Sequence, residues 1–108
     1  MTAPPTPDDY PARRLDLIFA ALADPTRRAL LDRLLAHDGQ RTSELAVGFA
    51  MSRQAISKHL DVLEEAGLAV SQRKQGETRL FLNRMPLRRF LNMWIEKYTR
   101  LQVRVDCF

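Results

Sequence analysis

The sequence predicts a mostly α-helical domain that carries one β-hairpin, and three observations lead to this fold class. Apolar residues recur at helical spacing over most of the chain, whereas residues 68–83 hold two short β-like runs. The chain has 108 residues, of which 45% are hydrophobic, and this is enough for one compact core and too little for two. We therefore expect one domain over residues 12–106.

An N-terminal tail precedes this domain. Prolines crowd into the first eleven residues, where their fixed φ and missing N–H groups oppose regular structure. We expect residues 1–11 to be disordered or extended, with a first helix over about residues 9–22. The apolar stripe of that helix consists of Leu15, Ile18, Phe19 and Leu22.

A second helix should begin at Pro25, because proline at the first helical position loses no hydrogen bond and Asp24 before it can cap the helix. This helix should end near His37. A short third helix is predicted over about residues 42–49, starting at a threonine or serine and ending at a phenylalanine.

Ser52 should cap the fourth helix, which ends at Gly67, a residue suited to the left-handed conformation after a helix C-terminus. The two β-like runs follow, and Gly76 supplies the turn of a hairpin. The last helix starts at Pro86, and its apolar stripe has alternating gaps of four and three. The members of that stripe are Leu87, Leu91, Trp94, Tyr98, Leu101 and Val105.

This order of elements is that of a winged helix-turn-helix, with the hairpin as the wing. Its fourth helix would pack on the second through Ile56, Leu60 and Leu63, which share one face. The side chains that would read DNA from this helix are Ser52, Arg53, Gln54, Ser57 and Lys58. A recognition helix contacts base edges with its N-terminal turns, and the acidic residues of this helix fall in its last turns.

Basic and hydroxyl side chains elsewhere are candidates for phosphate contacts. They are Arg73, Lys74 and Arg79 around the hairpin tip, and Arg41, Thr42 and Ser43 at the start of the third helix. A net charge of +4 favours a polyanionic partner. Between residues 41 and 79, however, there are six basic and five acidic residues, so the interpretation depends on local segregation of charge. Arg27 and Arg28 leave two interpretations open, a phosphate contact or a solvated first turn.

The runs LADPTRRALLDRLL and TSELAVGFAMSRQAISKHLDVLEEAGLAVSQRKQGETRLFLN resemble the ArsR family of bacterial winged-helix repressors, over residues 15 to about 105. The resemblance implies a homodimer that binds an inverted-repeat operator near its own promoter and blocks transcription. It also implies a dimer formed by the first and last helices. The expected interface residues are Leu15, Ile18, Phe19, Leu87, Leu91, Trp94, Tyr98 and Leu101.

The chain departs from the metal-sensing members of that family. Those members carry thiolates in the third helix, in a run of the form ELCVCDL, where this chain has ELAVGFA with Ala46 and Gly48 in the cysteine places. The last helix contains no histidine, and His37, His59 and Cys107 form no ligand grouping by their spacing. We expect no metal and no cofactor. For His59 we expect a place at the edge of the core and a hydrogen bond to a backbone group.

An enzyme is not expected, because the sequence contains no paired carboxylates, Cys/His arrangement, phosphate-binding loop or HExxH run. The alternatives to a repressor are a winged-helix module that binds another protein and a metal- or redox-responsive sensor. The chain has neither a membrane span nor an apolar N-terminal signal, so we expect a cytoplasmic protein without a membrane partner. The role of the single cysteine, the operator sequence and any small-molecule inducer stay open.

Overall fold

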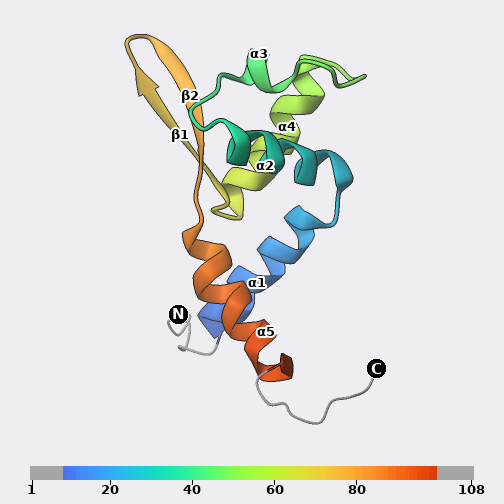
Figure 1. Ribbon diagram of the computed structural model, residues 1–108, viewed down its shortest axis with the longest axis vertical. Helices are drawn as coiled ribbons and strands as arrows, with labels where there is room; N and C mark the ends of the chain where they lie inside the picture. Colours follow the sequence, from blue (N-terminus) through green and yellow to red (C-terminus); the bar gives the residue numbers. More distant parts are fainter. Residues whose placement is uncertain (1–8, 100–108) are drawn as a thin grey trace, which may run out of the picture.

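The structure is a computed structural model that describes residues 9–99, with the side chains of residues 13–99 (Figure 1). Its elements are α1 (Asp9–Leu22), α2 (Pro25–Ala36), α3 (Thr42–Leu45), α4 (Arg53–Glu65), β1 (Ala69–Lys74), β2 (Glu77–Leu82), the π-helical turn η1 (Leu87–Leu91) and α5 (Asn92–Thr99). This confirms the predicted fold class, because four helices precede a two-stranded antiparallel hairpin and a further helix follows it.

The apolar core lies between α1, α2, α4 and the base of the hairpin. The fully buried large side chains are Ile18, Leu30, Leu34, Leu45, Ile56, Leu63 and Leu68. Burying a side chain of this size contributes about 2 kcal/mol to folding, so this cluster fixes how the helices pack. Ile18, which was expected at a dimer interface, is 0% exposed in the single chain and therefore belongs to this core.

The predicted helix starts are confirmed by their capping contacts. The carboxylate of Asp24 accepts hydrogen bonds from the backbone N–H groups of Thr26 and Arg27, at 2.8 and 3.1 Å. These bonds satisfy donors that have no partner within the helix. At the other end of the core, α4 gives way to Gly67, whose φ of 80° is the left-handed conformation expected there.

The third helix is shorter than predicted. It ends at Leu45 rather than Phe49, and residues 46–52 form the connection to α4. The reason is local, because Gly48 adopts a φ of 88° that a continuing α-helix does not allow. The side chain of Arg33 takes the place of the missing helical bonds by donating to the carbonyl oxygens of Leu45 and Val47.

The wing pairs β1 with β2 in a register that sets Ala69 opposite Leu82 and Lys74 opposite Glu77. Only Gln75 and Gly76 form the turn, and both have positive φ, as a two-residue type I′ hairpin requires. Leu80 forms a further antiparallel bridge to Gln40. The hairpin is thus fastened at its base, and its tip projects away from the helices (Figure 1).

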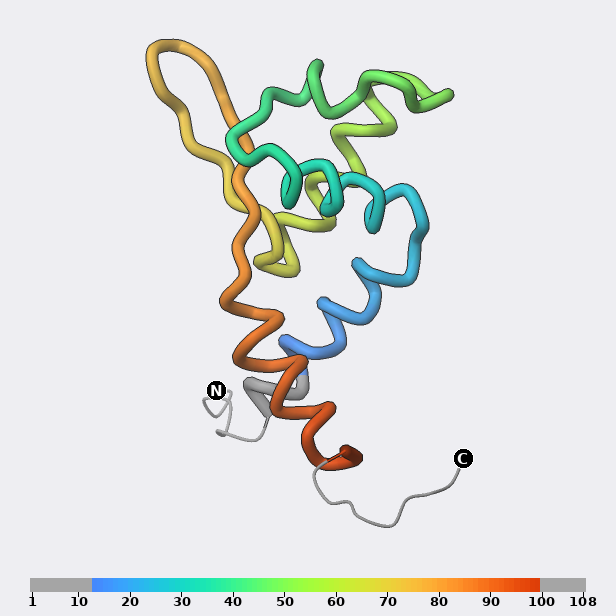
Figure 2. The backbone as a smooth tube through the Cα atoms, in the orientation of Figure 1, coloured from blue at the N-terminus to red at the C-terminus, as the bar shows by residue number. Residues whose placement is uncertain are grey.

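Helices α1 and α5 lie together at the end of the molecule opposite to the wing tip (Figure 2). The π-helical turn at the start of the last helix carries Leu87 and Phe90, which pack against the core and join this helix to it. Predicted as one regular helix, this element instead widens at η1 before it continues as α5. None of its residues in the described range is as fully buried as the core residues of α4.

Two predicted boundaries are affected at the chain ends. Helix α1 already begins at Asp9, so residues 9–11 belong to a helix although they were also assigned to the tail. Leu101, Val105 and Cys107 lie outside the described residues. Within the described range, no helix has the length and apolar character that crossing a bilayer requires.

Candidate nucleic-acid interface

The N-terminal end of α4 presents polar side chains to solvent. Ser52 caps the helix, since its Oγ accepts a hydrogen bond from the backbone N–H three residues later at 3.1 Å. Arg53, Gln54 and Lys58 are exposed on the first two turns, and Ser57 between them is half-buried. The opposite face of the helix is buried in the core. The sequence-predicted readers therefore lie together on one helix end that the core holds in place.

Charge is segregated along α4. The basic residues Arg53 and Lys58 lie in its first half, while Asp61, Glu64 and Glu65 lie in its second half. The N-terminus of a helix also carries a partial positive charge from its aligned peptide dipoles. The end with the basic residues is therefore the end of α4 that attracts an anion.

The wing carries two exposed basic residues beside its tip. Arg73 and Lys74 are the last residues of β1, and both are exposed. They stand opposite Thr78 and Glu77 on the partner strand. The hairpin that carries these two residues projects from the helical body (Figure 1).

The other basic residue predicted at the wing, Arg79, forms contacts within the chain. Its guanidinium donates to the carbonyl oxygen of Gly39 at 2.9 Å and to the carboxylate of Glu77 at 3.1 Å. Arg41 is similarly engaged, with ion pairs to Glu44 at 3.4 Å and to Glu77 at 3.7 Å. These two arginines join the start of α3 to the wing, and the neighbouring carboxylates offset their positive charge.

The start of α3 is formed by Arg41, Thr42 and Ser43. The backbone N–H of Arg41 donates to Oε1 of Glu44 at 2.7 Å, and this bond, with that from its guanidinium, holds the pKa of Glu44 below its usual value. Thr42 and Ser43 are half-buried in this single turn. The backbone N–H group of Arg41 at the start of the helix therefore already donates to an anionic side chain, that of Glu44.

Arg33 of α2 supports the turn that leads into α4. Besides donating to the carbonyl oxygens of Leu45 and Val47, its guanidinium carbon lies 4.4 Å from the centroid of the Phe49 ring. A cation over an aromatic face is attracted by the ring quadrupole. The sequence carries no local signal of this role for Arg33, because the carbonyl groups that it contacts lie 12 and 14 positions away.

Arg27 is half-buried and Arg28 is exposed, and both side chains donate to carbonyl groups at the end of α1. Arg27 donates through Nε to the carbonyl oxygen of Ala21 at 2.8 Å and through Nη2 to that of Ala20 at 3.0 Å. Arg28 donates to the carbonyl oxygen of Leu22 at 2.6 Å. These are the last carbonyl groups of α1, which have no partner within their own helix. Both arginines therefore cap α1 from the first turn of α2.

An aromatic cluster joins α1 to α5. The rings of Phe19 and Trp94 meet edge to face with centroids 5.1 Å apart, and the ring of Tyr98 lies 5.1 Å from that of Trp94. Phe19 is 39% exposed and Tyr98 is 70% exposed, so the cluster also forms part of the surface of the single chain. Half-buried Leu15 and Leu91 belong to the same two helices. Of the remaining predicted interface residues, Leu87 packs against the core.

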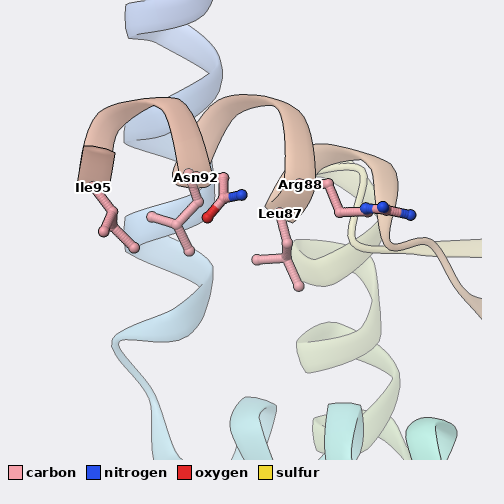
Figure 3. A pocket seen from close by; sticks show the side chains of 5 residues that line it. Leu87, Arg88, Asn92 and Ile95 are labelled. Carbon is pink, nitrogen blue, oxygen red and sulfur yellow. The ribbon is translucent and has the colours of Figure 1, made fainter. Parts of the chain in front are cut away.

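A shallow hollow runs along the π-helical turn and the start of α5. Its lining consists of Leu87, Arg88, Leu91, Asn92 and Ile95. Figure 3 shows the side chains of Leu87, Asn92 and Ile95 projecting from the same side of the helix. The hollow is open to solvent and mainly apolar, with an arginine and an amide at its edge.

The third-helix positions that bear thiolates in metal sensors hold Ala46 and Gly48 in this chain, and neither side chain has a ligating atom. Within the described residues, no three side chains of the ligating types His, Cys, Asp and Glu come together. His59 lies at the edge of the core as expected, but its Nδ1 contacts Nη1 of Arg27 at 3.2 Å rather than a backbone group.

Comparison with known proteins gives the same architecture. A family described as a helix-turn-helix domain matches residues 22–72, which include α2, α3 and α4. The HTH-type transcriptional regulator YuzN of Bacillus subtilis is 44% identical over 87 residues, which are 75% of this chain and 95% of that protein. The crystal structure of an ArsR family transcriptional regulator superimposes with a TM-score of 0.74 at 31% identity, over 82% of this chain and 90% of that one. The chain belongs to the ArsR family of helix-turn-helix transcriptional regulators.

Two further relatives of this ArsR family chain differ in how closely they match it. The transcriptional repressor SdpR of Bacillus subtilis is 39% identical over 57 residues, which are 53% of this chain and 62% of that protein. A homodimeric winged helix-turn-helix DNA-binding domain of Mycobacterium bovis has a TM-score of 0.67, covers 97% of this chain and 100% of that one, and is 18% identical. At that identity the likeness shows the fold alone. The ArsR family consists of DNA-binding regulators and is not a class of enzymes.

Proposed function

We propose that the protein is a transcriptional repressor that binds an inverted-repeat DNA operator as a homodimer and regulates its own gene. The observation that carries this proposal is the end of α4, where Arg53, Gln54 and Lys58 are exposed next to the Ser52 cap. Arginine, glutamine and lysine are the side chains that pair with base edges in the major groove. A helix of this kind enters that groove with its N-terminal turns first.

The side chains divide into a reader, which contacts base edges, and a clamp, which contacts the DNA backbone or the minor groove. We assign each residue from the exposure of its side chain and from its ion pairs. Gln54 can form a bidentate pair with adenine, and Ser57 can bond several base edges, so these two residues select sequence. Arg73 and Lys74 are exposed at the wing and bind phosphates or the minor groove. Arg41 and Arg79 stabilise the wing through their ion pairs. Because carboxylates neutralise them, they contribute only weakly to the positive potential near DNA.

The dimer in this proposal forms through α1 and α5. A lone chain exposes Phe19 and Tyr98 on an aromatic cluster, and large exposed aromatics of this kind mark association surfaces. The homodimeric state of the Mycobacterium bovis domain supports a dimer of the same fold. Repression is supported by the likeness to the transcriptional repressor SdpR over 57 residues. Two-fold symmetry then requires inverted half-sites whose centres lie one helical turn of DNA, or a multiple of it, apart.

The test is a footprint of the purified protein on the DNA directly upstream of its own gene. A protected palindrome that disappears with Gln54→Ala, while that variant remains folded and dimeric, is the expected result. A matched control is Gln72→Ala, because Gln72 is also an exposed glutamine but lies on β1 away from α4. Absence of any protected site at protein concentrations up to the onset of non-specific binding would contradict the proposal and favour a protein-binding winged helix.

A further inference from the structure

One side chain connects the end of α1 with α4. The guanidinium of Arg27 uses all three of its nitrogen atoms, donating through Nε and Nη2 to the carbonyl oxygens of Ala21 and Ala20 and meeting Nδ1 of His59 with Nη1. The distances are 2.8, 3.0 and 3.2 Å. In this way a residue of α2 contacts two other helices at once.

The chemistry of the Arg27–His59 contact fixes the protonation of the imidazole. Arginine has five N–H donors and no acceptor, and it stays charged in proteins. Nδ1 of His59 must therefore accept, which places the ring proton of the neutral imidazole on Nε2. A protonated imidazole would have no acceptor to offer and would set a cation against the guanidinium.

We propose that the Arg27–His59 contact positions the recognition helix α4 relative to α1, so that DNA affinity depends on this contact. The inference deepens the proposed function and rests on it, because it assigns α4 to the reading of DNA and α1 to the dimer. His59 lies one residue from Lys58 and two from Ser57 on α4, and both of these are among the proposed DNA contacts. A shift of α4 at His59 moves those side chains with it. Arg27 and His59 act by position and need not touch DNA.

The strength of the contact sets the expected size of the effect. It is one charged hydrogen bond, between Nη1 of Arg27 and Nδ1 of His59 at 3.2 Å. Its loss weakens DNA binding by about three- to tenfold rather than abolishing it.

The variants follow from the contacts. Arg27→Met removes the guanidinium and keeps an apolar stem, and His59→Leu removes the acceptor at similar volume. Arg28→Met is the matched control, because Arg28 also caps α1, through the carbonyl oxygen of Leu22, and its bond does not reach α4. We expect Arg27→Met and His59→Leu each to weaken operator binding about three- to tenfold, and the double variant to be no weaker than either alone. Urea unfolding of each variant confirms that the folded fraction is unchanged in the binding assay.

A conservative variant separates positioning from mere stability. His59→Gln keeps a neutral acceptor for the guanidinium of Arg27, so it should retain more operator affinity than His59→Leu. Equal loss of affinity for Arg28→Met and Arg27→Met, additive effects in the double variant, or equal losses for His59→Gln and His59→Leu would overturn the proposal.

A measurement without DNA distinguishes failure of this inference from failure of the proposed function. In 15N-labelled protein, correlations between the ring protons and ring nitrogens of His59 report which nitrogen carries the proton. We expect an unprotonated Nδ1 that accepts from Arg27, and a changed Nδ1 chemical shift in Arg27→Met, where that donor is lost. A protonated Nδ1 would overturn the contact itself. If the contact is present but the wild type prefers no DNA sequence, the proposed function fails. The contact then cannot serve to position α4 for reading DNA.

Discussion

The guanidinium carbon of Arg33 lies 4.4 Å from the centroid of the Phe49 ring, so a side chain of α2 holds the turn that leads into α4. The same guanidinium bonds the carbonyl oxygens of Leu45 and Val47. The short α3 ends where these bonds begin. Two arginines of α2 therefore contact the α4 region, Arg33 at the turn before the helix and Arg27 at His59 in its middle.

Replacing Arg33 tests this support. Arg33→Met should lower the free energy of unfolding by about 1–3 kcal/mol, because two backbone carbonyl groups lose a charged donor and the ring loses its cation. Arg33→Lys should recover only part of this loss, since lysine keeps the charge but has no planar guanidinium to stack on the Phe49 ring. Urea unfolding followed by circular dichroism measures both. An Arg33→Met protein as stable as the wild type would show that the turn holds itself.

The dimer surface can be tested with two exposed residues of α5 on different faces. Tyr98 is 70% exposed within the aromatic cluster, and Met93 is 60% exposed outside it. Tyr98→Glu should therefore dissociate the dimer, because burying a charge in an apolar interface is unfavourable, whereas Met93→Glu should leave it intact. Sedimentation velocity at micromolar concentration gives the mass of each. A monomeric wild type would refute the dimer, and equal effects of both variants would refute this choice of face.

Aspartate 24 links stability to pH. Backbone N–H donation from Arg27, with that from Thr26, lowers the pKa of the Asp24 carboxyl in the folded protein. A carboxyl whose pKa is depressed on folding stabilises the protein above its unfolded pKa, near 3.9, and this contribution disappears as the pH falls through the lower folded value. Asp24→Asn should accordingly be less stable than the wild type at pH 7, and the difference should shrink below about pH 4. Thermal unfolding between pH 7 and pH 3 measures it, and a difference independent of pH would contradict the capping role.

Metal ions should leave DNA binding unchanged. Ala46 and Gly48 have no ligating atoms at the positions where metal-sensing relatives have thiolates, so zinc has no thiolate site in α3. Operator binding should be the same with added zinc and with a chelator. A stoichiometric zinc ion in the purified protein, together with a several-fold change in affinity on its removal, would show that other residues form a site.

Local sequence patterns were sufficient to predict most of the fold. The caps at Asp24 and Ser52, the left-handed Gly67 and the turn at Gly76 depend on neighbours within a few residues, and the structure confirms each of them. Long-range contacts were not accessible in the same way. Ile18 has the spacing of a surface stripe, and only the three-dimensional packing shows that α2 and α4 already bury it.

The arginines show the same limit at the candidate site. The sequence does not show whether the partner of a basic residue is a phosphate or a backbone carbonyl many residues away. Arg79 reaches Gly39 across 40 positions, and Arg33 reaches Leu45 across 12. Arg27 and Arg28 offered one usable signal, because bases just after a helix end can bond its last carbonyl groups.

Binding of the wild type, Gln54→Ala and Arg73→Ala to the operator and to a scrambled duplex, measured over a range of salt, tests the central claim most directly. Gln54→Ala should cost about 1–3 kcal/mol on the operator and little on the scrambled duplex if Gln54 reads base edges as proposed. Arg73→Ala should weaken binding to both and reduce the salt slope by about one if Arg73 meets the DNA backbone as proposed. Equal weakening on both duplexes by Gln54→Ala, with an operator-only effect of Arg73→Ala, would contradict the assignment of α4 as the reader and the wing as the clamp.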